Sequence, residues 1–186
     1  MPDAPEPARR PALDGLLLYR LHRLFSVGGS LVIRLCEGQF GITRREWRLI
    51  AVLAGRPDLS SSQLAQHAYL DAARTSRAIG SLVDKALVLR THAPGDRRQV
   101  KLRLTPAGDA LYEQLFPLVE GINAQLLQAL APGEVQRFDQ AIAQLQARAA
   151  QMVAASTLPK ADRRRRAALS PPGVATGRRS PRPAPD

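Results

Sequence analysis

Hydrophobic positions recur with the period of an α-helix over most of the chain. The first stripe covers residues 13–39 and predicts a long first helix. Its members are Leu13, Leu17, Leu21, Leu24, Leu31 and Leu35. The pair Gly28-Gly29 interrupts this stripe, and we expect it either to bend the helix or to let another backbone approach closely. Gly41 then ends the helix.

Capping signals predict the helices that follow. Thr43, with Glu46 three residues later, forms a capping box that opens a second helix over about 44–54. A serine, either Ser60 or Ser61, caps a short third helix. The residues expected on the buried side of that third helix are Leu64, Ala65 and Ala68.

A fourth helix combines an apolar face with a basic one. Asp71 is its expected N-cap, and the helix runs to about residue 86. The residues facing inward are Ile79, Leu82 and Val83. The residues facing solvent are Arg74, Arg77, Ser81 and Lys85. Thr75 lies between the two arginines, and we expect it to point toward the core.

Two β-type segments follow, over residues 87–90 and 100–104, and the second alternates strictly between apolar and polar residues. Residues 93–96, Ala-Pro-Gly-Asp, are a turn signal between them. The pattern therefore predicts a short β-hairpin directly after the fourth helix.

Two long helices complete the pattern. Thr105 supplies an N-cap and Pro106 a proline at the first position of a helix over about 106–130, which must kink at Pro117. The next three residues, Ala-Pro-Gly, break this helix, and a last one covers about 134–155. Its apolar stripe consists of Val135, Phe138, Ile142, Leu145, Ala149 and Met152 or Val153. The fold class predicted is mainly α, with a small β-hairpin.

Length and composition divide the chain into one domain and two tails. A chain of 186 residues can bury one sizeable core and is too short for two ordinary domains. Residues 1–12 are rich in proline, and residues 156–186 consist mainly of Pro, Arg, Ser, Gly and Ala without periodicity. We expect both segments to be disordered, which leaves 13–155 as the domain.

The net charge of +11 is concentrated in the second tail. Residues 1–155 contain 19 Lys and Arg against 14 Asp and Glu, whereas residues 156–186 contain 8 against 2. The domain's own excess is compatible with a polyanionic partner and also with a merely soluble protein. The tail, with four consecutive arginines at 163–166, either adds non-specific attraction to phosphates or is a dispensable extension.

The sequence offers little for other kinds of chemistry. A single cysteine, Cys36, excludes an intramolecular disulfide and fits a reducing compartment. Without an apolar run of membrane length or a signal peptide, we expect a cytoplasmic protein. The three histidines, His22, His67 and His92, are too dispersed for a metal site, and we expect no cofactor.

The residues favour neither an enzyme nor a redox sensor. An enzyme is not expected, because the chain has no paired carboxylates in a plausible cleft, no Gly-rich phosphate loop and no nucleophile with a base at usable spacing. Cys36 could be a redox sensor, but a buried, inert thiol is the interpretation we prefer.

Three motifs occur in order within LDAARTSRAIGSLVDKALVLRTHAPGDRRQVKLRLTPAGDALY. They are the helix pattern ending in Leu82-Val83, the Asp-x-Arg of Asp96 and Arg98, and Leu104-Thr105-Pro106-x-Gly108. With the order of elements, they resemble the MarR-type (multiple-antibiotic-resistance regulator) family of bacterial transcription factors over roughly residues 13–155. Ala86 departs from the glycine common in that family, which we expect to shift a turn without changing the fold.

The resemblance implies a winged helix-turn-helix fold, in which the hairpin is the wing. The DNA-binding lobe would cover about 41–105, and the dimerisation helices about 13–39 and 106–155. A homodimer would place two recognition helices in successive major grooves of double-stranded DNA, so that the operator is a near-palindrome.

The resemblance also assigns DNA contacts to individual residues. Those expected on bases and phosphates are Arg74, Ser76 and Arg77 of the recognition helix and Arg97 and Arg98 of the wing. Arg98 would enter the minor groove, and Asp96 would orient the wing by pairing with an arginine. Ser61 and Ser62 would either bind a backbone phosphate or only cap their helix. The alternative for the arginines is an ordinary solvated surface.

Many members of this family bind a small effector, often aromatic and anionic, between the dimer platform and the DNA-binding lobe. The candidate contacts here are Arg20, His22, Arg23, Trp47 and Arg48. Trp47 is alternatively a core residue.

The function predicted is a homodimeric transcriptional repressor that an effector, aromatic or phenolic, releases from its operator. The alternative is an architectural protein that binds DNA without regard to sequence, mainly through the basic tail.

Overall fold

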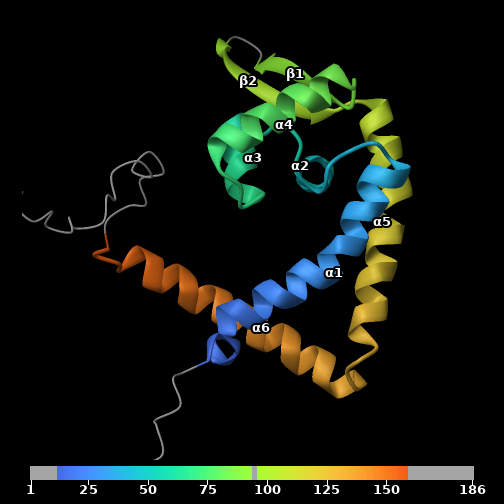
Figure 1. The fold of residues 1–186 in the computed structure, drawn as a ribbon. Coiled ribbons are helices and arrows are strands. Elements are labelled where there is room, and N and C mark those ends of the chain that lie inside the picture. Colours follow the sequence, from blue (N-terminus) through green and yellow to red (C-terminus); the bar gives the residue numbers. More distant parts are fainter. Residues whose placement is uncertain (1–11, 94–95, 159–186) are drawn as a thin grey trace, which may run out of the picture. The chain divides into compact units, whose positions relative to one another are not determined.

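The computed structural model describes residues 12–93 and 96–158 (Figure 1). These residues form a mainly helical fold with one two-stranded antiparallel sheet, as predicted. The elements are η1 (Leu13–Gly15), α1 (Leu17–Gln39), α2 (Arg44–Gly55), α3 (Ser61–His67), α4 (Ala72–Asp84), β1 (Val88–Ala93), β2 (Asp96–Leu104), α5 (Pro106–Leu127) and α6 (Pro132–Ala154). The expected disorder of 1–12 and 156–186 concerns residues that lie almost entirely outside the described ranges.

The chain divides into two compact units. The first, Met1–Val135, contains every element from η1 to α5 and the first turn of α6. The second, Gln136–Asp186, contains the rest of α6. None of the helices in the described ranges is long and apolar enough to cross a membrane.

Side-chain caps start α2, α3 and α4. The Thr43 hydroxyl accepts from the Glu46 N–H at 3.2 Å, and the Thr43 N–H donates to Glu46 Oε2 at 2.6 Å. Ser60 and Gln63 form the same reciprocal pair at the start of α3. Asp71 caps α4 through its carboxylate. The predicted capping positions are therefore confirmed, with the first of the two candidate serines as the cap of α3.

The core lies between α2, α3, α4 and the hairpin, and the start of α5 and the end of α1 contribute to it. Its largest fully buried aliphatic side chains are Ile42, Leu49, Ile50, Leu53, Leu64, Ile79, Leu82, Leu102 and Leu115. The buried side predicted for α3 is confirmed, as are Ile79 and Leu82 of α4, whereas Val83 is only half-buried. Helix period thus identified most of the inward face of the helix-turn-helix.

The hairpin is longer than its alternating residues predict. The strands pair from Val88 with Leu104 up to Ala93 with Asp96, so two residues of the predicted turn are paired strand residues. The backbone pairing therefore extends beyond the alternating residues 100–104. Its base is held to the α2–α3 turn, where the Leu102 N–H donates to the Leu59 carbonyl at 2.9 Å and Arg103 pairs with Asp58.

The two glycines of α1 do not interrupt the helix, which runs on from Leu17 to Gln39. A Cβ on Gly29 would lie 2.5 Å from Nη1 of Arg44, whereas a Cβ on Gly28 would meet only Leu126 Cδ2 at 3.8 Å. We expected another backbone to approach these glycines closely, but the group that approaches Gly29 is the side chain of Arg44.

The predicted ends of the last two helices need small corrections. α5 includes Pro117 and ends at Leu127, three residues before the predicted end. α6 begins at Pro132, because proline fits the first turn of a helix, where its missing N–H has no intrahelical partner. Pro132 was predicted only to break the preceding helix, but it is also the first residue of α6.

The motif Leu-Thr-Pro-x-Gly fixes the start of α5 against the end of the helix-turn-helix. The Thr105 hydroxyl accepts from the Gly108 N–H at 3.0 Å and donates to the Ala86 carbonyl at 2.7 Å. The Thr105 N–H donates to the Leu87 carbonyl at 3.1 Å. A Cβ on Gly108 would lie 2.1 Å from that same Leu87 oxygen. Position 108 therefore requires glycine, for lack of space and not for its backbone freedom.

Residues with left-handed backbone flank α4 on both sides. Tyr69, before the helix, has a φ of 52° and a side chain that is 92% exposed, and Ala86, after it, has a φ of 55°. Neither is glycine, so each costs about 1–2 kcal/mol of backbone strain. At Ala86 the chain keeps the fold, as expected, by adopting the conformation that glycine adopts more easily.

Gly108→Ala should lower the free energy of unfolding by about 2 kcal/mol, because the new methyl group overlaps a backbone carbonyl that cannot rotate away. Chemical denaturation measures this directly. Gly121→Ala, on the same helix with nothing within 4 Å of the new Cβ, is the matched control and should stabilise by roughly 0.5–1 kcal/mol. Equal effects of the two substitutions would contradict the role of Gly108.

Candidate DNA-binding surface and ligand pocket

The two faces of α4 differ sharply in environment. Thr75 is 1% exposed, and its hydroxyl donates to the Asp71 carbonyl at 2.9 Å, which confirms its inward orientation. Arg74, Ser76 and Arg77 are exposed on the other side of the helix. The core therefore holds one face of α4 rigidly while the opposite face presents cations and a hydroxyl to solvent.

The exposed arginines of α4 form few and weak interactions with the described part of the chain. Arg74 Nε lies 3.4 Å from Asp71 Oδ2, and the Arg74 side chain is 56% exposed. An exposed pair of this kind contributes little to stability, so the guanidinium can leave it for a stronger anion. Arg77 is exposed and forms no ion pair within the described residues.

Arg45 lies beside these residues and was not predicted as part of the site. It lines a shallow surface hollow together with Arg74 and Arg77, so that α2 adds a third cation to the face of α4. Arg45 was not predicted because it lies on α2, before the helix-turn-helix and the wing in the sequence. Its position two residues after the Thr43 cap, on the side of α2 away from the core, was the available signal.

Lys85 does not simply face solvent, as was predicted, because it holds α4 to the start of α2. Its Nζ lies 3.0 Å from Glu46 Oε2 and donates to the Gly41 carbonyl at 2.9 Å. Glu46 is 2% exposed. Burial raises the pKa of Glu46, but hydrogen bonds from Ser81 and Thr43 and the ammonium of Lys85 outweigh it and hold the pKa below its ordinary value.

The remaining predicted DNA contacts are only partly described. Ser61 and Ser62 are exposed at the start of α3, where Ser60 alone accepts the capping bond and lies 3.0 Å from the Ser62 hydroxyl. Asp96, Arg97 and Arg98 belong to β2, but their side chains lie outside the described residues, and so does the expected pairing of Asp96 with an arginine.

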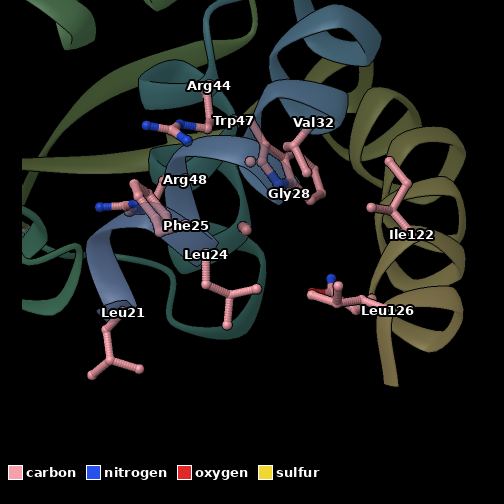
Figure 2. A pocket seen from close by; sticks show the side chains of 13 residues that line it. Leu21, Leu24, Phe25, Gly28, Val32, Arg44, Trp47, Arg48, Ile122 and Leu126 are labelled. Atoms are coloured by element: carbon pink, nitrogen blue, oxygen red, sulfur yellow. The ribbon is translucent and has the colours of Figure 1, made fainter. Parts of the chain in front are cut away.

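A pocket of about 400 Å³ lies between α1, α2 and α5 (Figure 2). Its apolar lining consists of Leu21, Leu24, Phe25, Gly28, Gly29, Val32, Trp47, Ala51, Ile122 and Leu126. Trp47 is 7% exposed and stacks on Tyr112 with ring centroids 5.8 Å apart. The two interpretations of Trp47 are therefore compatible, since this core side chain also forms a pocket wall.

Arg44, Arg48 and Asn123 complete the pocket lining. Arg44 lies over the Phe25 ring, with its Cζ 4.3 Å from the ring centroid. Arg48 Nη1 donates to the Ala68 carbonyl at 3.4 Å. Burial lowers the pKa of Arg48, and the like charges of Arg44 and Arg45 lower it further. An apolar pocket with a cationic end is suited to an aromatic anion.

The predicted effector contacts do not form one group. Trp47 and Arg48 line the pocket, whereas Arg20 and Arg23 line a separate hollow on α1 with Leu24 and Val27. His22 lies 3.4 Å from the Ser26 hydroxyl and lines neither. Arg44 was missed because sequence spacing alone does not reveal the space that Gly29 leaves on the neighbouring helix.

Cys36 is fully buried, and burial together with the nearby Glu37 raises the pKa of its thiol. A thiol in this environment is a poor nucleophile, as the preferred interpretation held. Within the described ranges, no three His, Cys, Asp or Glu side chains are grouped so that they could hold a metal ion.

Comparison with known proteins agrees with this geometry. A model of the MarR family matches residues 40–99. The HTH-type transcriptional repressor Rv2887 of Mycobacterium tuberculosis is 26% identical over 131 residues, which cover 70% of this chain and 91% of that protein. A MarR-family regulator from Silicibacter pomeroyi has a similar structure, with a TM-score of 0.63, 26% identity, and coverage of 74% of this chain and 92% of its own.

The structure of Rv2887 in complex with salicylic acid is also similar, with a TM-score of 0.60 and 27% identity, and the match covers 73% of this chain and 99% of that one. The capped helices α3 and α4 with the hairpin after them define a winged helix-turn-helix protein. Together, the family model, the curated repressors and the similar structures support a winged helix-turn-helix regulator of the MarR family.

Glu46→Gln should lower the free energy of unfolding by about 2 kcal/mol at pH 7, because it removes a buried charge that holds Lys85 and caps α2. A carboxylate with a depressed pKa stabilises the folded state above its unfolded pKa, and this contribution disappears as the pH falls through the folded pKa. The difference from wild type should therefore shrink below about pH 4.

Denaturant titrations at several pH values measure that difference. Glu113→Gln, at an exposed position on α5, is the control and should change stability little at any pH. A difference between wild type and Glu46→Gln that stays constant down to pH 3 would contradict the charged network.

Proposed function

We propose that the chain is a homodimeric, cytoplasmic transcriptional repressor without catalytic activity, and that it binds a near-palindromic operator in double-stranded DNA. The observation that carries this proposal is the two-sided environment of α4, whose buried Thr75 face fixes the orientation of the exposed Arg74, Ser76 and Arg77. The repressor Rv2887 among the similar proteins supports it.

In this proposal the recognition helix α4 enters the major groove. Arg74, Ser76 and Arg77 contact base edges and phosphates, and Arg45 adds a phosphate contact from α2. Ser61 and Ser62 donate to the backbone at the start of α3. Arg97 and Arg98 of the wing reach the minor groove, with Asp96 orienting them.

The dimer would use the helices over about 13–39 and 106–155, with the DNA-binding lobe over about 41–105. Large apolar side chains exposed on α1, including Leu18 and Val27, and on α6, including Met152 and Val153, support this assignment. Two-fold symmetry would then set the recognition helices about 34–36 Å apart, one turn of the double helix.

A small aromatic or phenolic anion in the pocket would relieve repression. The combination of apolar walls with Arg44 and Arg48 supports such a ligand, as does the salicylic acid bound by the similar protein Rv2887. The ligand would favour dimers whose recognition helices no longer fit the groove spacing, which requires that it bind the two states with different affinity.

Arg77→Ala and Arg98→Ala should each weaken operator binding about tenfold or more while the dimer persists, because each loses a forked contact to DNA. The operator is first identified by sequencing the DNA that the protein retains from a random pool. Affinity is then measured at moderate salt, and the oligomeric state by sedimentation.

Arg34→Ala removes the same charge from an exposed position on α1, outside the proposed DNA contacts, and serves as the control. It should change operator affinity only slightly. Unchanged affinity of Arg98→Ala would contradict the assignment of the wing, and a monomeric wild-type protein would contradict the whole arrangement.

The architectural alternative makes a different prediction for the basic tail. If the operator model is right, removal of residues 156–186 should weaken binding to random duplexes and reduce its salt dependence, while preference for the operator remains. Titrations of both proteins with operator and random DNA measure this. Loss of all binding on removal of the tail would favour the architectural protein.

A further inference from the structure

Arg44 depends on a position in another helix for its placement. Its guanidinium lies over Phe25, and its Nη1 occupies the place where a side chain on Gly29 would begin. A Cβ at position 29 would come within 2.5 Å of that nitrogen, which is closer than real Cβ contacts allow. The residue at position 29 of α1 therefore determines where the Arg44 guanidinium of α2 can lie.

Among the described residues, no carboxylate lines the pocket, and Glu37 lies in an adjoining hollow with Arg44 and Arg48. Figure 2 shows the guanidinium groups of Arg44 and Arg48 at the same end of the pocket, away from Ile122 and Leu126. Within the described part of the chain, no carboxylate forms an ion pair with either arginine. Burial lowers the pKa of Arg48, and the like charges of Arg44 and Arg45 add to this effect. A bound anion would relieve the repulsion between these like charges.

We propose that Gly29 makes the pocket selective for anionic ligands, because it leaves the space in which Arg44 is held against Phe25 at the pocket's cationic end. This inference rests on the proposed effector site and assigns its selectivity to a particular pair of residues. Gly29 is a positioning residue, since it acts through the Arg44 guanidinium, and Arg44 is the group that contacts the ligand.

Alanine at position 29 separates this role from folding. The atom it displaces is the end of a flexible side chain, so the arginine can move while the helix backbone stays in place. Alanine also has a higher helix propensity than glycine, so α1 should become more stable. A loss of ligand affinity in Gly29→Ala therefore cannot come from unfolding, and thermal denaturation verifies this.

The experiment compares two probes of nearly the same shape, salicylate and its neutral amide, salicylamide, by calorimetric titration of the full chain at pH 7. The wild-type protein should bind salicylate about tenfold more tightly or better, because a charge-assisted hydrogen bond to arginine is stronger than a neutral one. Gly29→Ala should lose most of this preference by weakening salicylate binding, with salicylamide binding little changed. Arg44→Gln should have the same effect.

Two glycines of the same helix provide matched controls. Gly38→Ala adds a methyl group with nothing within 4 Å and should leave the binding of both probes unchanged. Gly28→Ala adds a methyl group to the pocket lining without reaching Arg44, so it should affect both probes equally.

The outcomes separate this inference from the function on which it rests. If the wild-type protein binds neither probe at millimolar concentration, the effector proposal itself is overturned. If wild type binds both probes equally, or if Gly29→Ala keeps the preference for salicylate or weakens both probes alike, the role of Gly29 is overturned and the effector site remains. Selective loss of salicylate binding supports the inference.

Discussion

The close approach of Gly108 to the Leu87 carbonyl determines how the helix-turn-helix and the hairpin are attached to α5. Thr105 bonds both to Gly108 and to the Ala86 carbonyl, so the end of the helix-turn-helix, the base of the wing and the start of α5 meet within a few residues. Since α5 also provides Leu115 to the core and Ile122 to the pocket, a rigid start of α5 fixes the distance between pocket and recognition helix. Any coupling between ligand and DNA must act through or around this junction.

A second constraint is the buried carboxylate of Glu46, which serves two elements at once. It completes the cap of α2 and receives the Lys85 ammonium from the end of α4. α4 is thus held by its apolar face, by its Asp71 cap and by this charge pair. The same helix α2 carries Arg45 toward the DNA-binding surface and Arg44 and Arg48 toward the pocket, so one short helix connects both candidate sites.

Local chemistry made much of the fold predictable from sequence. The caps at Thr43, Ser60 and Asp71 and the inward positions Ile79 and Leu82 depend on neighbours within one helical turn, which the sequence displays directly. Features that depend on distant contacts could not be predicted in the same way. Lys85 was predicted to face solvent because its partner Glu46 lies 39 residues earlier in the sequence and comes beside it only in the folded chain. The close approach of Arg44 to Gly29 likewise exists only once α1 and α2 are packed together.

Tyr69 before α4 and Ala86 after it both have a left-handed backbone conformation, which is strained for residues other than glycine. Tyr69 and Ala86 each adopt an unfavourable backbone conformation within a hydrogen-bonded turn, in which the Tyr69 N–H donates to the Gln66 carbonyl at 3.1 Å and the Ala86 N–H donates to the Val83 carbonyl at 2.9 Å. A tilt of the helix that lets either residue return to negative φ recovers about 1–2 kcal/mol. A ligand that favours a tilted α4 would therefore need that much less binding energy to stabilise the tilted conformation.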